Sequence, residues 1–127
     1  MKKLLLDTSG YSRLMSGDRA VLEALADADQ IFMSVFVLGE LYAAFRGGDR
    51  EKGNRDQLRR FMESSTVRLL QAGDDTAEIF GRLKHQLKLA GTPVPINDLW
   101  IAAHAVESGS HLVTFDRHFS MIPGVLL

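Results

Sequence analysis

Cysteine is missing from the 127 residues of the chain. Its absence excludes disulfide frameworks, thiolate zinc sites and cysteine nucleophiles. An excess of charge of one sign is also missing, because 15 Lys and Arg residues stand against 16 Asp and Glu residues. Balanced charge gives the whole molecule no general attraction for nucleic acid or for an anionic membrane. Any contact with nucleic acid therefore has to come from a local basic patch.

Long hydrophobic runs are missing as well, since a membrane span needs about 20 apolar residues. The opening MKKLLLDTSG resembles the start of a signal peptide, but its apolar run ends at Asp7. That is short of the roughly 7–15 apolar residues that a signal peptide contains. We therefore expect a cytoplasmic protein without membrane contact. The length and the 46% of hydrophobic residues suit one globular domain over residues 1–127.

Short apolar segments alternate with helix-like segments along the whole chain. Strands are predicted at KKLLL, QIFMS, VRLL and HLVTFD, and the tail GVLL is predicted as an edge strand. Helices are predicted from about Tyr11, over 18–28, over 35–48 up to a pair of glycines, from about Gly53, over 74–91, and over INDLWIAAHA. This alternation predicts an α/β protein with a parallel sheet covered on both faces.

Several acidic residues stand where such a sheet binds ligands, outside the carboxyl ends of its strands. Asp7 closes the first predicted strand, Asp116 closes the fourth, and Asp98 opens the helix that follows TPVP. Glu40 is different, because it lies on a helix whose neighbouring positions are apolar or small. Each acid also has a purely structural interpretation. Asp7 and Asp98 are competent helix caps, and so is Asn97. Asp116 suits a turn at the end of a strand. Glu40 would be satisfied by an ion pair with a buried arginine.

Convergence of the four acids would have a large electrostatic consequence. Two ionised carboxylates about 5 Å apart repel by roughly 3 kcal/mol at an effective dielectric constant near 20. Several such pairs would offset much of the stability of a small domain, which is typically about 5–15 kcal/mol. The cluster must then stay partly protonated or hold a cation. Oxygen ligands without cysteine point to a hard divalent ion, Mg²⁺ or Mn²⁺.

Four motifs in order, LLLDTS, LGELYAA, INDLWIAAHA and LVTFDRHF, resemble those of the PIN-domain family, most closely its VapC-type toxins. These toxins are the ribonuclease half of type II toxin–antitoxin pairs. The resemblance spans nearly the whole chain. It implies a PIN-like (Rossmann-like) three-layer α/β/α fold with a short, mostly parallel sheet of four to five strands. It also implies a Mg²⁺- or Mn²⁺-dependent endoribonuclease, a homodimer, and a cognate VapB-type antitoxin that forms a hetero-oligomer with the toxin and covers its acidic site.

Carried over by motif, the resemblance assigns Asp7, Glu40, Asp98 and Asp116 to the catalytic metal site and places Thr114 where relatives often have a hydroxyl residue. On a strand, Thr114 would share a face with Asp116. Our hypothesis is that Asp7, Asp98 and Asp116 hold the metal. Glu40 would orient or deprotonate the attacking water, or complete a second metal site. Thr114 and Asn97 would fix the carboxylates in place.

Two groups of basic residues are the candidates for RNA contacts, although an exposed helix face that is merely solvated would look the same. They are Arg46, Arg50, Lys52, Arg55, Arg59 and Arg60 in one segment and Arg82, Lys84 and Lys88 in another. Among the histidines, His104 is expected to pack near Trp100. His85 and His111 are expected at the surface, and His118 stands close enough to Asp116 to touch a substrate.

Two other functions compete with the ribonuclease. A receiver or haloacid-dehalogenase type of phosphoryl-transfer protein also has an Asp at a strand end. The dehalogenase pattern, however, needs a second Asp where this chain has Ser9, and the receiver pattern needs paired acids where Asp7 stands alone. The chain also lacks the phosphate-binding G-x-x-x-x-G-K-[ST] loop. The other competitor is a catalytically idle PIN-like domain that acts only within a protein complex, for instance as a corepressor.

Overall fold

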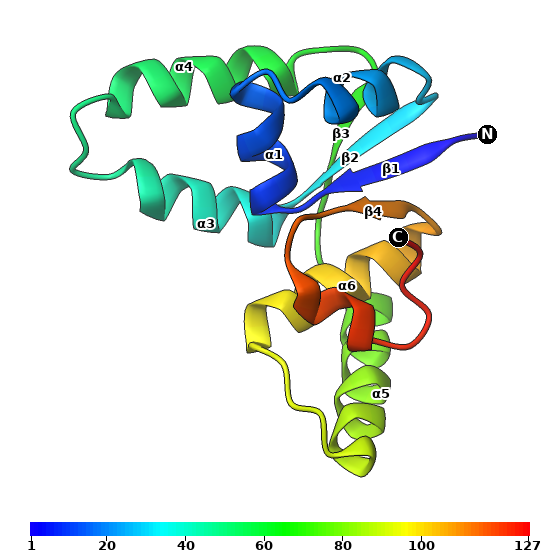
Figure 1. The fold of residues 1–127 in the computed structure, drawn as a ribbon. Coiled ribbons are helices and arrows are strands. Elements are labelled where there is room, and N and C mark those ends of the chain that lie inside the picture. Colours follow the sequence, from blue (N-terminus) through cyan, green and yellow to red (C-terminus); the bar gives the residue numbers. More distant parts are fainter.

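The computed structural model describes all 127 residues and contains one parallel sheet with helices on both sides (Figure 1). The sheet order is β3-β2-β1-β4, with β1 (Lys3–Leu6), β2 (Gln30–Ser34), β3 (Val67–Leu70) and β4 (His111–Val113). The helices are α1 (Thr8–Met15), α2 (Arg19–Ala26), α3 (Val35–Phe45), α4 (Glu51–Met62), α5 (Asp74–Ala90) and α6 (Ile96–Ser108), followed by the 3₁₀-helix η1 (Arg117–Met121). The predicted α/β fold with a parallel sheet is confirmed.

The central strand β1 shows why the sheet needs two covering layers. Leu4, Leu5 and Leu6 are consecutive and all buried, so side chains on both faces of the strand are shielded from water. An uninterrupted apolar run of this kind is typical of a parallel strand between two helical layers. Leu5 lies opposite Phe32 on one neighbour and Leu112 on the other.

In Figure 1, α1, α2 and α4 lie on one side of the strands, and α5 and α6 lie on the other. Helix α3 leaves the carboxyl end of β2, forms an arm with α4, and also contacts α6. The three layers place the carboxyl ends of β1, β2 and β4 next to the first turns of α1, α3 and η1. None of the helices combines the length and the hydropathy that crossing a bilayer requires.

Several predicted boundaries were wrong. The tail forms a single bridge between His111 and Leu126 instead of an edge strand. Strand β4 ends at Val113, so Thr114 and Asp116 lie in the loop beyond it. Helix α1 begins at Thr8, directly after the cap Asp7, and α4 begins at Glu51. Helix α3 ends at Phe45, ahead of the predicted glycine pair. Caps and bridges depend on contacts between distant residues, which periodicity does not reveal.

Helix α6 is held against the sheet by a buried histidine. His104 is fully buried, with Nδ1 2.8 Å from Ser34 Oγ and Nε2 3.1 Å from the carbonyl oxygen of Gln71. A carbonyl only accepts, so Nε2 donates and Nδ1 accepts from Ser34, which describes a neutral imidazole. Burial accordingly lowers the pKa of His104. Phe36 links it to Trp100, since its ring centroid is 5.4 Å from His104 and 5.2 Å from Trp100. His104 is therefore a core residue, as expected.

Candidate active site

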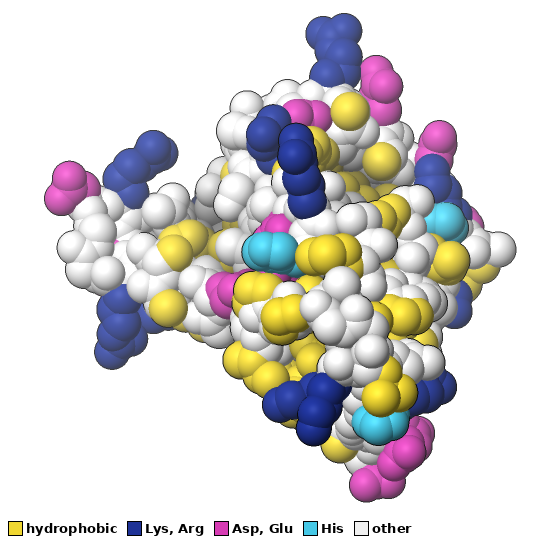
Figure 2. Space-filling view, turned by 60° about the horizontal axis from the view of Figure 1, so that its bottom comes forward, with side chains coloured by type: hydrophobic (Ala, Val, Ile, Leu, Met, Phe, Trp, Pro, Cys, Tyr) yellow, Lys and Arg dark blue, Asp and Glu magenta, His cyan; other side chains and the backbone are white.

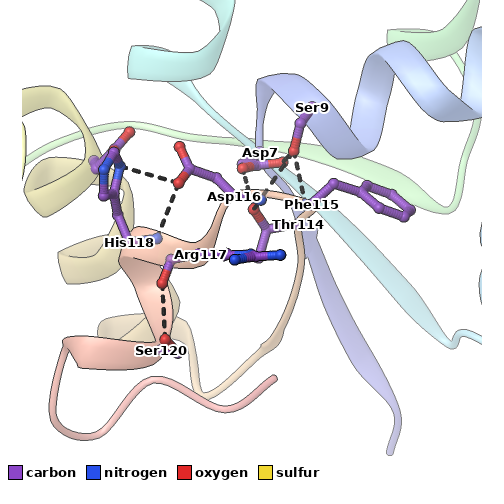
Figure 3. Close-up of polar contacts among 9 residues, drawn as sticks. Asp7, Ser9, Thr114, Phe115, Asp116, Arg117, His118 and Ser120 are labelled. Atoms are coloured by element: carbon purple, nitrogen blue, oxygen red, sulfur yellow. Dashed lines mark hydrogen bonds and ion pairs between the residues drawn. The ribbon is translucent and has the colours of Figure 1, made fainter.

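Asp7 lies where β1 passes into α1, and both oxygens of its carboxylate are engaged. Its Oδ1 accepts from the Gly10 N–H and from the Ser9 hydroxyl, each at 2.7 Å. Its Oδ2 accepts from the hydroxyl of Thr114, in the loop after β4 (Figure 3). Asp7 is therefore the cap of α1, as its structural interpretation predicted, and at the same time a buried carboxylate held in one rotamer.

Thr114 connects Asp7 with Asp116, although not in the predicted way. The strand has ended before these residues, so they do not share a strand face. Instead, Thr114 donates its hydroxyl hydrogen to Asp7 and accepts the backbone N–H of Asp116 at 3.0 Å. A single hydroxyl thus links the end of β1 to the loop that carries Asp116.

Glu40 projects from α3 toward the start of α1. The Thr8 hydroxyl donates to Glu40 Oε1, and no lysine or arginine lies within ion-pair distance of the carboxylate. The buried arginine that would have explained Glu40 structurally is therefore absent. One oxygen is held by Thr8, and the other has no protein partner.

Asp98 lies in the first turn of α6 and does not cap that helix, contrary to the structural interpretation. Pro95 occupies the cap position and no side chain caps the helix. The carboxylate is 15% exposed and gains some favourable interaction from the positive end of the helix dipole. Asn97 forms no side-chain hydrogen bond to the acids, so its expected role in fixing a carboxylate was wrong.

Asp116 and Asp98 face each other across His118. His118 Nδ1 lies 3.2 Å from Asp98 Oδ2 and 3.0 Å from Asp116 Oδ1. One ligand atom from each of these three residues falls within a group spanning 4.8 Å. Asp116 also caps η1 by accepting the His118 N–H at 2.9 Å. Asp116 therefore stabilises a turn, as expected, and also belongs to the group with Asp98 and His118.

The pKa values of Asp7 and Asp98 are both raised, and a neighbouring carboxylate contributes to each shift. Burial raises the pKa of Asp7 above 3.8, and the charge of Asp116 raises it further, while hydrogen bonds from Thr114, Gly10 and Ser9 lower it. Burial also raises the pKa of Asp98, as do the charges of Asp116 and Glu40, against the lowering effect of His118. Asp116 therefore acts on both Asp7 and Asp98, and Glu40 acts on Asp98.

The donor set of this site suits a hard divalent cation. Asp98 and Asp116 offer carboxylate oxygens within 4.8 Å of each other, and neither is paired with lysine or arginine. Carboxylates left without a cationic partner repel, and a divalent ion relieves the repulsion. The two carboxylate oxygens and the histidine nitrogen form a candidate site for a divalent cation. Figure 2 shows acidic side chains beside a histidine near the middle of this face of the molecule.

Three residues that position the site were not predicted for it. Thr8 binds Glu40, Ser9 binds Asp7, and Gly10 allows α1 to approach β4, since a Cβ there would lie 2.3 Å from the Val113 carbonyl oxygen. The signal for them was present in the sequence, because D-T-S-G directly after an apolar strand is a helix start rich in hydroxyl donors.

The basic residues expected to contact RNA fall into two groups, those that form an ion pair within the protein and those that do not. On α4, Lys52 and Arg59 pair with Asp56, and Arg55 pairs with Glu51. These side chains largely satisfy one another on their own helix, which favours the solvated-face interpretation for them. Arg46, Arg50 and Arg60 have no such pair.

Comparison with known proteins agrees with this geometry. Residues 4–125 match the family model described as PIN domain. The chain is 32% identical over 120 residues to Ribonuclease VapC5 of Mycobacterium tuberculosis, covering 94% of this chain and 87% of the relative. It is 30% identical over 107 residues to Ribonuclease VapC2 of Rickettsia felis, covering 84% and 78%. The crystal structure of VapBC2 from Rickettsia felis bound to a DNA fragment from their promoter aligns with a TM-score of 0.84 and 26% identity, covering 98% of this chain and 96% of that one.

Proposed function

The chain belongs to the PIN domain family and, within it, to the VapC ribonucleases, and on this premise we propose that it is the endoribonuclease toxin of a toxin–antitoxin pair. It hydrolyses RNA phosphodiester bonds at the carboxylate cluster of Asp7, Glu40, Asp98 and Asp116. The observation that carries the proposal is that one carboxylate oxygen each of Asp98 and Asp116 lie within 4.8 Å of each other, while Thr114 links Asp116 to Asp7. None of the four acids forms an ion pair with lysine or arginine. Membership of this family makes the phosphoryl-transfer alternative wrong.

Asp98, Asp116 and Asp7 are the residues that would hold Mg²⁺ or Mn²⁺. When bound, a divalent ion lowers the pKa of a coordinated water and stabilises negative charge on the phosphate. The chain itself keeps the carboxylates in place. Ser9, Gly10 and Thr114 occupy part of the acceptor capacity of Asp7 and restrain its rotation.

Glu40 is the proposed base. The Thr8 hydroxyl restrains one of its oxygens, which leaves the other to accept a proton from the attacking water. Because Thr8 follows Asp7 directly, the water-orienting carboxylate and the metal-holding carboxylate are positioned by the same first turn of α1.

The proposed partners are an RNA substrate, a second copy of this chain and a cognate antitoxin. An unneutralised carboxylate cluster is a good receptor for an arginine side chain, which forms paired hydrogen bonds with carboxylates. The Rickettsia felis relative was crystallised as a VapBC2 complex with promoter DNA. A catalytically idle domain that works only in such a complex would not need all four acids, and this chain retains all of them.

The test is cleavage of a pool of RNA molecules with Mg²⁺ or Mn²⁺, followed by sequencing of the cut ends. We expect specific cuts that disappear with EDTA. In the Asp7→Asn and Asp98→Asn variants, we expect a loss beyond the roughly 10- to 100-fold that removal of a supporting residue causes. Asp56→Asn is the matched control, because Asp56 pairs with Lys52 and Arg59 on α4, away from the cluster.

Cleavage that persists in EDTA, or in both cluster variants, would contradict the metal-dependent mechanism. A wild-type protein that cuts no RNA, although it binds an antitoxin and promoter DNA, would support the idle domain instead.

A further inference from the structure

An aromatic side chain is exposed beside the carboxylate cluster without a structural reason. Phe115 is 46% exposed and stands between Thr114 and Asp116. In Figure 3 its ring extends away from the Asp116 carboxylate and from His118. A single exposed apolar residue is ordinary on a protein surface, so its placement has to be judged from its contacts.

One of those contacts fixes the backbone of Phe115 relative to the site. The Phe115 N–H donates to the Ser9 hydroxyl at 2.9 Å, and the same hydroxyl donates to Asp7. The backbone that carries the ring is therefore tied to the carboxylate network through one side chain. A loop held in this way needs little further ordering of its backbone when a ligand binds.

Arg13 of α1 covers part of the ring. The guanidinium carbon lies 4.4 Å from the ring centroid, within the range of a cation–π contact. Arg13 also forms an ion pair with Asp18 at 3.6 Å, which restrains the guanidinium. Phe115 and Arg13 together present an aromatic ring and a cation at the rim of the site.

A hollow of about 400 Å³ opens beside the ring, lined in part by Thr114, Phe115, Asp116 and Arg117. Its volume is within the roughly 300–1,000 Å³ of small-ligand pockets. Arg13 does not line this hollow. Phe115 and Asp116 both line the hollow.

We propose that Phe115, backed by Arg13, is the stacking platform for one nucleobase of the RNA strand, next to the phosphate that is cleaved. The inference rests on the proposed ribonuclease function and adds a binding residue to it. Bases of single-stranded RNA stack on aromatic rings and on guanidinium groups. The base lies in the hollow against Phe115, and Arg117 faces the backbone of the strand.

Charge explains why the site needs such a platform. The carboxylate cluster repels the phosphates of RNA, and most of the basic side chains of α4 are already paired on their own helix. Attraction close to the cluster therefore has to come from stacking and from nearby cations. Phe115 and Arg117 flank Asp116 in the chain and supply both, while Arg13 backs the ring and stays paired with Asp18.

The experiment uses a short RNA that contains one mapped cleavage site and a set of copies, each with an abasic position near the cut. Affinity is measured in EDTA, which prevents cleavage, and kcat and KM are measured with Mn²⁺. Phe115→Leu keeps an apolar side chain but removes the aromatic ring, and Phe115→Trp restores a ring. Tyr42→Leu is the matched control, because Tyr42 is 40% exposed and has Arg55 4.9 Å from its ring centroid, on α3 and α4.

Stacking of one base on an aromatic side chain is worth roughly 5- to 150-fold in binding. We expect Phe115→Leu to weaken RNA binding within this range and to raise KM more than it lowers kcat. The wild type should lose a similar factor with one particular abasic RNA, on which Phe115→Leu should show little further loss. Phe115→Trp should restore the dependence on that base, and Tyr42→Leu should behave as the wild type.

If the wild type and Phe115→Leu lost the same factor in RNA affinity on every abasic RNA, Phe115 would not be a stacking platform. The proposed ribonuclease function would be unaffected by that result. Unchanged RNA binding by Phe115→Leu, together with weaker association of a copurified protein partner, would assign the exposed ring to a protein interface instead. A wild type that neither binds nor cuts RNA would remove the proposed function and the platform together.

Discussion

At the scale of single residues, the Asp7 carboxylate both caps a helix and belongs to the acidic cluster. Oδ1 caps α1 through the Gly10 N–H, and Oδ2 receives the Thr114 hydroxyl at the acidic cluster. Burial and the nearby Asp116 charge raise its pKa, so the cap is formed by a group that is costly to ionise. A neutral amide of the same shape could keep the cap and avoid that cost.

We expect Asp7→Asn to stabilise the metal-free protein increasingly as the pH rises above 3.8, the ordinary value for Asp. Because the pKa is raised in the folded state, the folded wild type still holds a proton that the unfolded chain has lost. Wild-type stability therefore falls as the pH rises through this window, and Asn has no proton to lose. Within the window, the difference in free energy of unfolding should grow by up to about 1.4 kcal/mol per pH unit, then level off.

Urea denaturation of both proteins in EDTA, from pH 4 to pH 8 in half-unit steps, measures this difference. A difference that stays flat over the whole range would show that folding does not perturb Asp7.

Single residues also show which interactions of the site could be predicted from the sequence. Capping by Asp7 acts over three residues and was predictable, and so was the presence of acids at strand ends. The hydroxyl of Thr114, 107 positions from Asp7, was placed by family resemblance, but its bond to Asp7 depends on how β4 lies against β1. Asp98 was misread as a cap because the cap position of α6 is taken by Pro95, one turn earlier.

At the scale of elements, the close approach of α1 to the end of β4 determines the geometry of the site. Gly10 makes that approach possible, since any side chain there would meet the Val113 carbonyl oxygen 2.3 Å from its Cβ and Asp7 Oδ1 at 3.3 Å. The same contact brings Ser9 to Phe115 and Thr114 to Asp7. The position of α1 and the position of the end of β4 therefore depend on each other.

We expect Gly10→Ala to push α1 away from β4, with a loss of about 1–3 kcal/mol in the free energy of unfolding, as for overpacked cores. RNA cleavage should fall with it, because Asp7 and Thr114 separate. Gly81→Ala is the control, since its Cβ would meet nothing within 4 Å and alanine favours the interior of α5. Urea denaturation and cleavage rates measure both effects. Wild-type activity in Gly10→Ala would refute the coupling.

Element order was predictable because alternating apolar segments read directly as strands between helices. The exact ends were not, and β4 illustrates the reason. Its predicted span included Thr114 and Asp116, yet pairing with β1 stops at Val113, opposite Leu6. Beyond that point β1 has already turned into α1, so no neighbour remains to hold a strand. The end of a strand is thus set by its partner rather than by its own residues.

At the scale of the whole molecule, a formal net charge of −1 conceals a local imbalance. Some surface acids have a basic partner nearby, as Asp18 has Arg13 and Asp56 has Arg59. The four acids of the cluster have only His118 between two of them. The fold therefore stores electrostatic repulsion at one edge of its sheet, and relief of that repulsion should be visible in global stability.

We expect Mn²⁺ or Mg²⁺ to raise the melting temperature of the wild type, because the ion binds the folded cluster and not the unfolded chain. At 100 times its Kd the ion adds about 2.7 kcal/mol, which for a domain of this size is roughly 10 °C. Asp98→Asn should melt higher than the wild type in EDTA and lose the increase with metal. Asp56→Asn should retain the increase, because Asp56 lies in the ion pairs of α4. Calorimetry with and without the ion distinguishes these outcomes. An equal increase in Asp98→Asn would mean that the ion stabilises the protein from some other place.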